Sequence, residues 1–257
     1  LQNLQYTQYN MNILISNDDG IFSEGLFALA NVLNKKHNVY IYVPDGNRSG
    51  FSRSLSFHKD IVVKKVEKDG FNEVYTISGT PGDAVKMALT YFLSDVKIDL
   101  VVSGINLGSN LGNDIFYSGT VNACFEANEC GYPAIAISNI AQNSFNFDGI
   151  VEFLDKNFEN LVKIADKSYT LNVNFPNLPY EKIKGVKFCK TGVCRYTDGY
   201  IKINENTYQL VGTPIPPSED EIDTDVYATH NGYVSITPVI HKVLSEEYLE
   251  KFKDFKF

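Results

Sequence analysis

Short apolar segments alternate with amphipathic segments along the chain up to about residue 180. Uninterrupted apolar runs at 13–15 and 39–43 are typical of strands buried on both faces of a parallel sheet. Between them, apolar residues over 26–33 recur with a helical period and predict a helix that packs on that sheet. Strand, helix and strand in this order form a βαβ unit, so we expect an α/β fold with a mostly parallel sheet flanked by helices.

The same pattern predicts most of the remaining elements. A strand pair is expected at 61–66 and 73–77, with a turn at Asp69-Gly70. A helix should begin after Thr80, because Thr is a good N-cap and Pro81 suits the first helical position. Further strands are predicted at 98–103, 133–138 and 170–175, and further helices from Tyr117 through Cys130 and over 147–165.

The pattern changes after about residue 180, where polar and apolar residues alternate. Segments 186–188, 200–203 and 208–211 have the alternation of half-exposed antiparallel strands, with a hairpin turn at Glu205-Asn206. An acidic, Pro-containing segment at 213–225 is interpreted as a mobile loop, followed by a final strand at 232–238 and an amphipathic helix at 245–252. A hairpin and a helix without a core of their own suggest an arm that packs on another subunit.

These patterns divide the chain into three parts. We interpret residues 1–10 as an N-terminal extension before a natural start at Met11, residues 11–178 as the main α/β domain, and residues 179–257 as a C-terminal oligomerisation arm. Residues 230–240 of that arm are expected to return to the core.

Composition narrows the function classes. With a formal net charge of −8, the chain lacks the basic surface of a nucleic-acid-binding protein. No apolar run reaches the roughly 18 residues of a membrane helix, and no export signal precedes Met11, so we expect a cytoplasmic protein that does not bind membranes. The cysteines are expected to be reduced, and the four histidines lack the spacing of a zinc site. Any metal should therefore be a hard ion bound by oxygen.

Candidate chemistry begins at Asp18 and Asp19, which follow the first apolar run and precede a turn at Gly20. Ligands of open α/β sheets bind beyond the carboxyl ends of the strands, so two carboxylates there indicate a metal site. The alternative is that the Asp-Asp-Gly turn only caps the next helix.

Two later loops add polar groups at other strand ends. The loop at 45–54 is rich in hydroxyls and includes Ser49, and the segment 104–114 contains three glycines and three asparagines. Ser118-Gly-Thr120 then opens a helix whose backbone N–H groups could hold a phosphate. Neither a Walker A loop nor a dinucleotide-binding glycine pattern is present. Ordinary surface loops and a helix cap would also account for these segments.

Taken together, the motifs resemble those of the SurE family of survival-protein nucleotidases over nearly all of Met11 to about Leu244. The resemblance implies a Rossmann-like domain with a C-terminal arm exchanged between subunits, in homodimers or homotetramers. Two departures are Gly82, where Ala or Thr is frequent, and residues 189–225, which follow no recognised pattern. The matching motifs are Ile15-Ser-Asn-Asp-Asp-Gly20, Asn47-Arg-Ser-Gly50, Ser78-Gly-Thr-Pro-Gly-Asp83, Val102-Ser-Gly-Ile-Asn-Leu-Gly108, Tyr117-Ser-Gly-Thr-Val121, Leu171-Asn-Val-Asn-Phe-Pro176 and Gly232-Tyr-Val-Ser-Ile-Thr-Pro238.

The resemblance also implies a site and a cofactor. One divalent cation per subunit, Mg²⁺ or Mn²⁺ with Ca²⁺ as a further possible occupant, would be held by four side chains. The phosphate would be held beside it by the asparagines and the helix start. The implied metal ligands are Asp18, Asp19, Ser49 and Asn106, and the implied phosphate contacts are Asn106, Asn110, Ser118, Gly119 and Thr120.

The implied activity is hydrolysis of nucleoside 5′-monophosphates, with some activity on 3′-monophosphates and short polyphosphate. A metal-activated water would attack phosphorus, with Asp18 and Asp19 as the catalytic carboxylates and Asp19 the preferred general base. Two alternatives stay open: an aspartyl-phosphate phosphatase of the haloacid dehalogenase type, and a nucleotide-binding module without catalysis. The first normally has Asp-x-Asp after its first strand, whereas here the carboxylates are adjacent.

Overall fold

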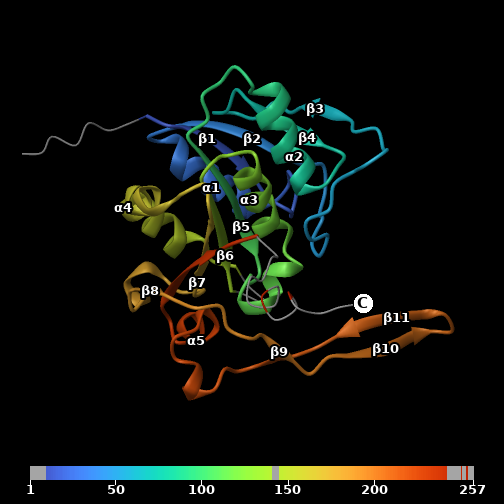
Figure 1. Ribbon diagram of the computed structural model, residues 1–257, viewed down its shortest axis with the longest axis vertical. Helices are drawn as coiled ribbons and strands as arrows, with labels where there is room; N and C mark the ends of the chain where they lie inside the picture. Colours follow the sequence, from blue (N-terminus) through green and yellow to red (C-terminus); the bar gives the residue numbers. More distant parts are fainter. Residues whose placement is uncertain (1–9, 141–144, 242–249, 251–252, 254–257) are drawn as a thin grey trace, which may run out of the picture.

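A nine-stranded mixed sheet forms the centre of the structure, a computed structural model (Figure 1). It describes residues 10–140, 145–241, 250 and 253. The expected extension at residues 1–10 therefore lies outside the described residues except for residue 10, and the expected helix at 245–252 lies outside them except for residue 250. The strand order is β3-β4-β2-β1-β5-β6-β7-β13-β8. The strands are β1 (Asn12–Ser16), β2 (Asn38–Pro44), β3 (Val63–Lys65), β4 (Val74–Ile77), β5 (Leu100–Leu107), β6 (Ala134–Asn139), β7 (Thr170–Phe175), β8 (Val186–Phe188) and β13 (Val234–Val239).

Six strands, from β4 to β7 in this order, run parallel, which confirms the predicted mostly parallel α/β fold. β3 and β13 pair antiparallel with β4 and β7 at the two sides. Strand β1 lies in the middle, and its side chains are buried on both faces. Ile13 and Ile15 belong to one apolar core, whereas Leu14 belongs to the other. This burial on both faces explains why the strand reads as an uninterrupted apolar run.

Helices cover both faces of the sheet. α1 (Glu24–Asn34) and α4 (Asp148–Ile164) share the core of Ile13 and Ile15, whereas α2 (Pro81–Met87) and α3 (Gly119–Glu129) share the core of Leu14. The predicted cap of α2 is confirmed, because the Thr80 hydroxyl accepts the Asp83 N–H at 3.1 Å. A π-helical turn, η1 (Ala88–Phe92), continues α2. Among the described helices, none has both the length and the apolar character needed to cross a bilayer.

The C-terminal part forms a long hairpin and a group of short helices and strands. The hairpin of β10 (Gly199–Asn204) and β11 (Thr207–Val211), with its predicted turn, extends away from the body of the molecule (Figure 1). Apolar side chains on it are exposed, among them Tyr200, Ile203 and Leu210. The remaining elements are η2 (Gly112–Phe116), η3 (Tyr180–Lys182), β9 (Arg195–Tyr196), β12 (Pro214–Ile215), η4 (Glu219–Glu221) and α5 (Asp225–His230).

Three expectations about local structure are wrong. β5 continues to Leu107, so residues 104–107 of the segment 104–114, which was expected to be a loop, are strand. β8 is not part of an antiparallel meander but pairs parallel with β13 inside the main sheet. Residues 213–225 are not a structureless loop, because β12 pairs with β9 and a capping box at Ser218 and Glu221 closes η4. In each case the structure depends on pairing with a strand distant in the sequence, and the local alternation of polar and apolar residues does not predict that pairing.

Candidate metal and phosphate site

A tight turn places the two adjacent carboxylates at the carboxyl end of β1. The Asn17 side chain closes this turn, since its Oδ1 accepts the Gly20 N–H at 3.1 Å and its Nδ2 donates to the Gly20 carbonyl at 3.0 Å. Gly20 has a φ of +86°, and a Cβ there would lie 2.7 Å from the carbonyl carbon of Gly46. The turn therefore needs glycine for both conformation and space.

Asp18 is buried and faces the first turn of α3. Its Oδ1 accepts a hydrogen bond from the Thr120 hydroxyl. A Cβ added to Gly119 would lie only 2.6 Å from the Asp18 Cβ, so the helix approaches this closely because residue 119 is glycine. Burial raises the pKa of Asp18, and hydrogen bonds from Thr120 and nearby backbone groups oppose that shift.

Asp19 is partly buried and lies against β5. Its Oδ2 accepts the Leu107 N–H at 3.2 Å. Burial, and secondarily the charge of Asp18, raises the pKa of Asp19 to about 6. The two carboxylates are thus held between two elements, Asp18 against α3 and Asp19 against β5.

A β-bulge brings Asn106 to this end of the sheet. The register between β5 and β6 shifts between Ser103 and Asn106, so one extra residue is accommodated in β5. Asn106 directly precedes Leu107, whose N–H binds Asp19. Its Nδ2 donates to the Gly108 carbonyl at 2.9 Å, which leaves the side-chain oxygen available as a ligand.

Ser49 is exposed on a segment tied to both halves of the site. On one side, the Arg48 N–H donates to the Asp18 carbonyl at 2.6 Å. On the other side, Ser52 donates through its hydroxyl to the Phe116 carbonyl at 2.6 Å and through its N–H to the Tyr117 carbonyl at 3.2 Å. Segment 48–52 therefore bridges the end of β1 and the residues directly before α3.

The start of α3 offers backbone donors beside Asp18. Ser118 is the N-cap, and its hydroxyl accepts the Val121 N–H at 3.0 Å. The Thr120 hydroxyl is already committed to Asp18. The backbone N–H groups of Gly119 and Thr120 also interact with the Asp18 carboxylate. An anion at this helix end would therefore share these donors with Asp18, at a position where the helix dipole favours negative charge.

Asn110 is placed differently from the other predicted contacts. It is buried, and its Nδ2 donates to the Ser138 hydroxyl at 2.8 Å. Its carbonyl accepts from the side chains of Asn172 at 2.7 Å and Asn174 at 3.1 Å. These contacts make Asn110 an anchor of the glycine-rich loop on β6 and β7. The sequence does indicate a special role for Asn172 and Asn174, because they are polar residues inside a strand predicted to be buried.

A buried carboxylate that was not predicted ties the Ser49 segment to α3 and α2. Glu126 is only 3% exposed. Its Oε1 lies 2.6 Å from Lys86 Nζ, and its Oε2 lies 3.5 Å from a guanidinium nitrogen of Arg53. Arg53 also lies 3.4 Å from Glu129. Because these residues lie on separate elements, local sequence patterns did not reveal the cluster.

The donor set at the end of β1 fits a hard divalent cation. Among the described residues, neither Asp18 nor Asp19 forms an ion pair with Lys or Arg. A cation between them would offset the cost of burying two neighbouring negative charges. Asn106 and Ser49 add neutral oxygens, the ligand type that Mg²⁺ and Mn²⁺ prefer. In the part of the chain that the structure describes, no three His, Cys, Asp or Glu side chains cluster.

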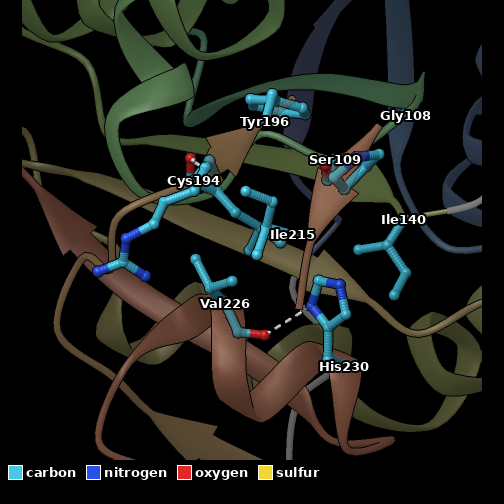
Figure 2. A pocket seen from close by; sticks show the side chains of 11 residues that line it. Gly108, Ser109, Ile140, Cys194, Tyr196, Ile215, Val226 and His230 are labelled. Atoms are coloured by element: carbon cyan, nitrogen blue, oxygen red, sulfur yellow. Dashed lines mark hydrogen bonds between the residues drawn. The ribbon is translucent and has the colours of Figure 1, made fainter. Parts of the chain in front are cut away.

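A pocket of about 170 Å³ lies next to the glycine-rich loop (Figure 2). None of the predicted metal or phosphate residues lines it. Gly108 and Ser109 do so, and these two residues lie between Asn106 and Asn110 in the chain. The pocket is therefore adjacent to the predicted site but separate from it.

Comparisons with known proteins identify a family and a similar solved structure. A family model described as "Survival protein SurE" matches residues 13–198. The chain is 36% identical to 5′-nucleotidase SurE of Petrotoga mobilis, over 95% of this chain and 99% of the relative. It is 39% identical to 5′-nucleotidase SurE of Clostridium botulinum, over 94% and 97%. The crystal structure of the SurE protein from Aquifex aeolicus is similar with a TM-score of 0.82 at 34% identity, covering 94% of this chain and 98% of that chain.

Proposed function

The chain belongs to the SurE family, and from this membership and the site geometry we propose that it is a metal-dependent 5′-nucleotidase. The substrate is a nucleoside 5′-monophosphate, with 3′-monophosphates and short polyphosphate as further substrates. The relatives that carry the name 5′-nucleotidase SurE match nearly their whole length, which supports carrying the activity across.

The observation that carries the proposal is the position of Asp18 against the first turn of α3. A carboxylate suited to a cation and a helix end suited to an anion lie in direct contact through Thr120 and Gly119. A phosphate monoester needs both, because its charge must be neutralised while its oxygens are oriented.

The residues proposed to hold the cation are Asp18, Asp19, Asn106 and Ser49, and their oxygens form a hard donor set. When bound, a divalent cation acts as a Lewis acid toward the phosphate ester. Segment 48–52 keeps Ser49 between the two halves of the site through Arg48 and Ser52.

The chain's own groups then account for orientation and proton transfer. Backbone N–H groups in the first turn of α3 orient the phosphoryl oxygens opposite the attacking water. Asp19 is the general base of the proposal. Its Oδ2 is held by the Leu107 N–H, so Oδ1 is the atom that accepts a proton as the water oxygen bonds to phosphorus. The ester bond to the nucleoside breaks in the same step, and the leaving nucleoside oxygen takes up a proton from solvent.

We also propose that the C-terminal part acts in assembly. Residues 179–257 would form the arm and residues 11–178 the catalytic domain, with 230–240 returning to the sheet. The exposed apolar side chains of the β10–β11 hairpin support an arm exchanged between subunits of a homodimer or homotetramer.

A phosphate-release assay tests the activity. AMP, GMP and an aryl phosphate are incubated with the full chain, with Mn²⁺, with Mg²⁺ or with a chelator. Cation-dependent release from the nucleotides supports the proposal. Binding of AMP without release would favour a nucleotide-binding module, and a trapped phosphoenzyme would favour an aspartyl-phosphate mechanism.

A further inference from the structure

The pocket beside the glycine-rich segment 104–114 lies close to Asn106, a predicted contact of both the cation and the phosphate. Asn106 Nδ2 binds the carbonyl of Gly108 at 2.9 Å, and Gly108 lines the pocket. Because successive Cα atoms are about 3.8 Å apart, Gly108 lies at most about 8 Å from Asn106 between Cα atoms. A ligand whose phosphate lies beside Asn106 can therefore extend toward this pocket.

The walls of the pocket come from elements far apart in the sequence. Its apolar lining includes Leu111, Ile140, Ile215 and Val226. In the view of Figure 2, the Tyr196 ring and the His230 imidazole lie at opposite ends, with Ile215 between them. Apolar walls with a few placed polar groups are typical of small-molecule sites.

Charge argues against a second phosphate at this place. Among the described residues that line the pocket, Arg195 is the only Lys or Arg, and its guanidinium already pairs with Glu221 at 3.0 and 3.1 Å. The Tyr196 hydroxyl donates to Asp114, which holds the ring in place. The described lining residues therefore offer apolar contacts and hydrogen bonds to a ligand, but no Lys or Arg that is free of an ion pair.

His230 supplies a defined acceptor. Its Nδ1 lies 2.9 Å from the Val226 carbonyl. A carbonyl only accepts, so Nδ1 carries the hydrogen, and in the neutral ring Nε2 is an acceptor. A ligand N–H or O–H can donate to this nitrogen.

The volume fits one ring system and not a whole nucleotide. At about 170 Å³ the pocket is close to the roughly 150 Å³ cavity that accepts benzene in an engineered protein. We propose that this pocket binds the base of the nucleotide, between Tyr196, Ile215 and His230, while the phosphate is held at the start of α3. This inference rests on the proposed nucleotidase function.

Two substrates that differ only in the base test the inference. Phosphate release from AMP and from ribose 5-phosphate is measured with Mn²⁺ for the wild type and for Ile215→Trp, which fills the pocket. We expect kcat/KM for AMP to fall about tenfold or more, mainly through KM, while the value for ribose 5-phosphate changes less than about twofold. Ile222→Trp is the matched control, because Ile222 is exposed and does not line the pocket, and it should change neither value.

His230→Phe provides a second variant on the surface of the pocket, where a folding defect is not expected. It should raise KM for AMP several-fold and leave ribose 5-phosphate unchanged. Equal losses for both substrates in Ile215→Trp, or unchanged AMP kinetics in both variants, would overturn the inference. A wild-type protein that releases phosphate from neither substrate would instead contradict the proposed function.

Discussion

The hydroxyl of Thr120 donates a hydrogen bond to Oδ1 of Asp18, across 102 positions of sequence. This contact joins the first turn of α3 to the end of β1. It connects the proposed anion-binding and cation-binding halves of the site, and it satisfies one oxygen of a buried carboxylate.

Replacing Thr120 by Val removes the donor while keeping the shape of the side chain. The buried Asp18 oxygen then lacks its partner, so the free energy of unfolding should fall by about 1–3 kcal/mol. Mn²⁺ affinity should fall about tenfold, as is usual when a group that orients a metal ligand is lost. Thr120→Ser keeps the hydroxyl and should retain both properties, as judged by urea unfolding and Mn²⁺ titration. Equal behaviour of the two variants would count against this role.

Gly119→Ala should move the start of α3 away from Asp18, and so separate the proposed anion-binding and cation-binding halves of the site. The new Cβ would lie 2.6 Å from the Asp18 Cβ, which is not a flexible group, so the helix start must move. A shift of this size should reduce phosphate release about tenfold or more. Gly199→Ala is the control, since a Cβ there meets nothing within 4 Å. A fully active Gly119→Ala enzyme would show that the close approach is not needed.

The Glu126 cluster should matter to metal binding through Arg53 and not through Lys86. Both cations contact the buried carboxylate, but only Arg53 follows the segment that bears Ser49. Arg53→Met should therefore weaken Mn²⁺ binding about tenfold, whereas Lys86→Met should change it less than about twofold while still lowering stability. Free Mn²⁺ measured by electron paramagnetic resonance distinguishes them. The same loss in both variants would indicate a general structural effect.

Asp19→Asn should stabilise the metal-free protein at neutral pH. The pKa of Asp19 is about 6 in the folded chain and about 3.8 as a reference value. Because the folded state holds this proton more tightly, the contribution of Asp19 to stability is fully present below pH 3.8 and is lost as pH rises through 6. At pH 7 the charged group therefore costs up to about 3 kcal/mol, which the variant avoids. Urea unfolding with a chelator should show a gain at pH 7 that disappears near pH 4.

The main sheet could be predicted from the sequence because its central strands are buried on both faces. The runs at 13–15 and 39–43 have no other simple interpretation, and both are strands in the structure. β8 could not be assigned in this way. Its three residues alternate between polar and apolar, as in any half-exposed strand. The parallel pairing depends on β13, a strand far along the chain that lies beside it.

Some residues of the candidate site could likewise be predicted from the sequence, and others could not. Asp18 and Asp19 directly follow a predicted strand, and the start of α3 belongs to a predicted helix. Their presence at one end of the sheet could therefore be expected. The bulge before Asn106 could not, because its glycine-rich segment reads as a loop. The contact of Arg53 with Glu126 spans 73 positions, and no local pattern predicts it.

Mn²⁺ binding by the carboxylate pair tests the central claim most directly. Calorimetric titration of the chelator-treated wild type should show one Mn²⁺ per chain, and AMP hydrolysis should rise in parallel with occupancy. Asp18→Asn and Asp19→Asn should each stay folded, lose most of the affinity and release no phosphate from AMP. Wild-type affinity or near-normal turnover in either variant would contradict the account.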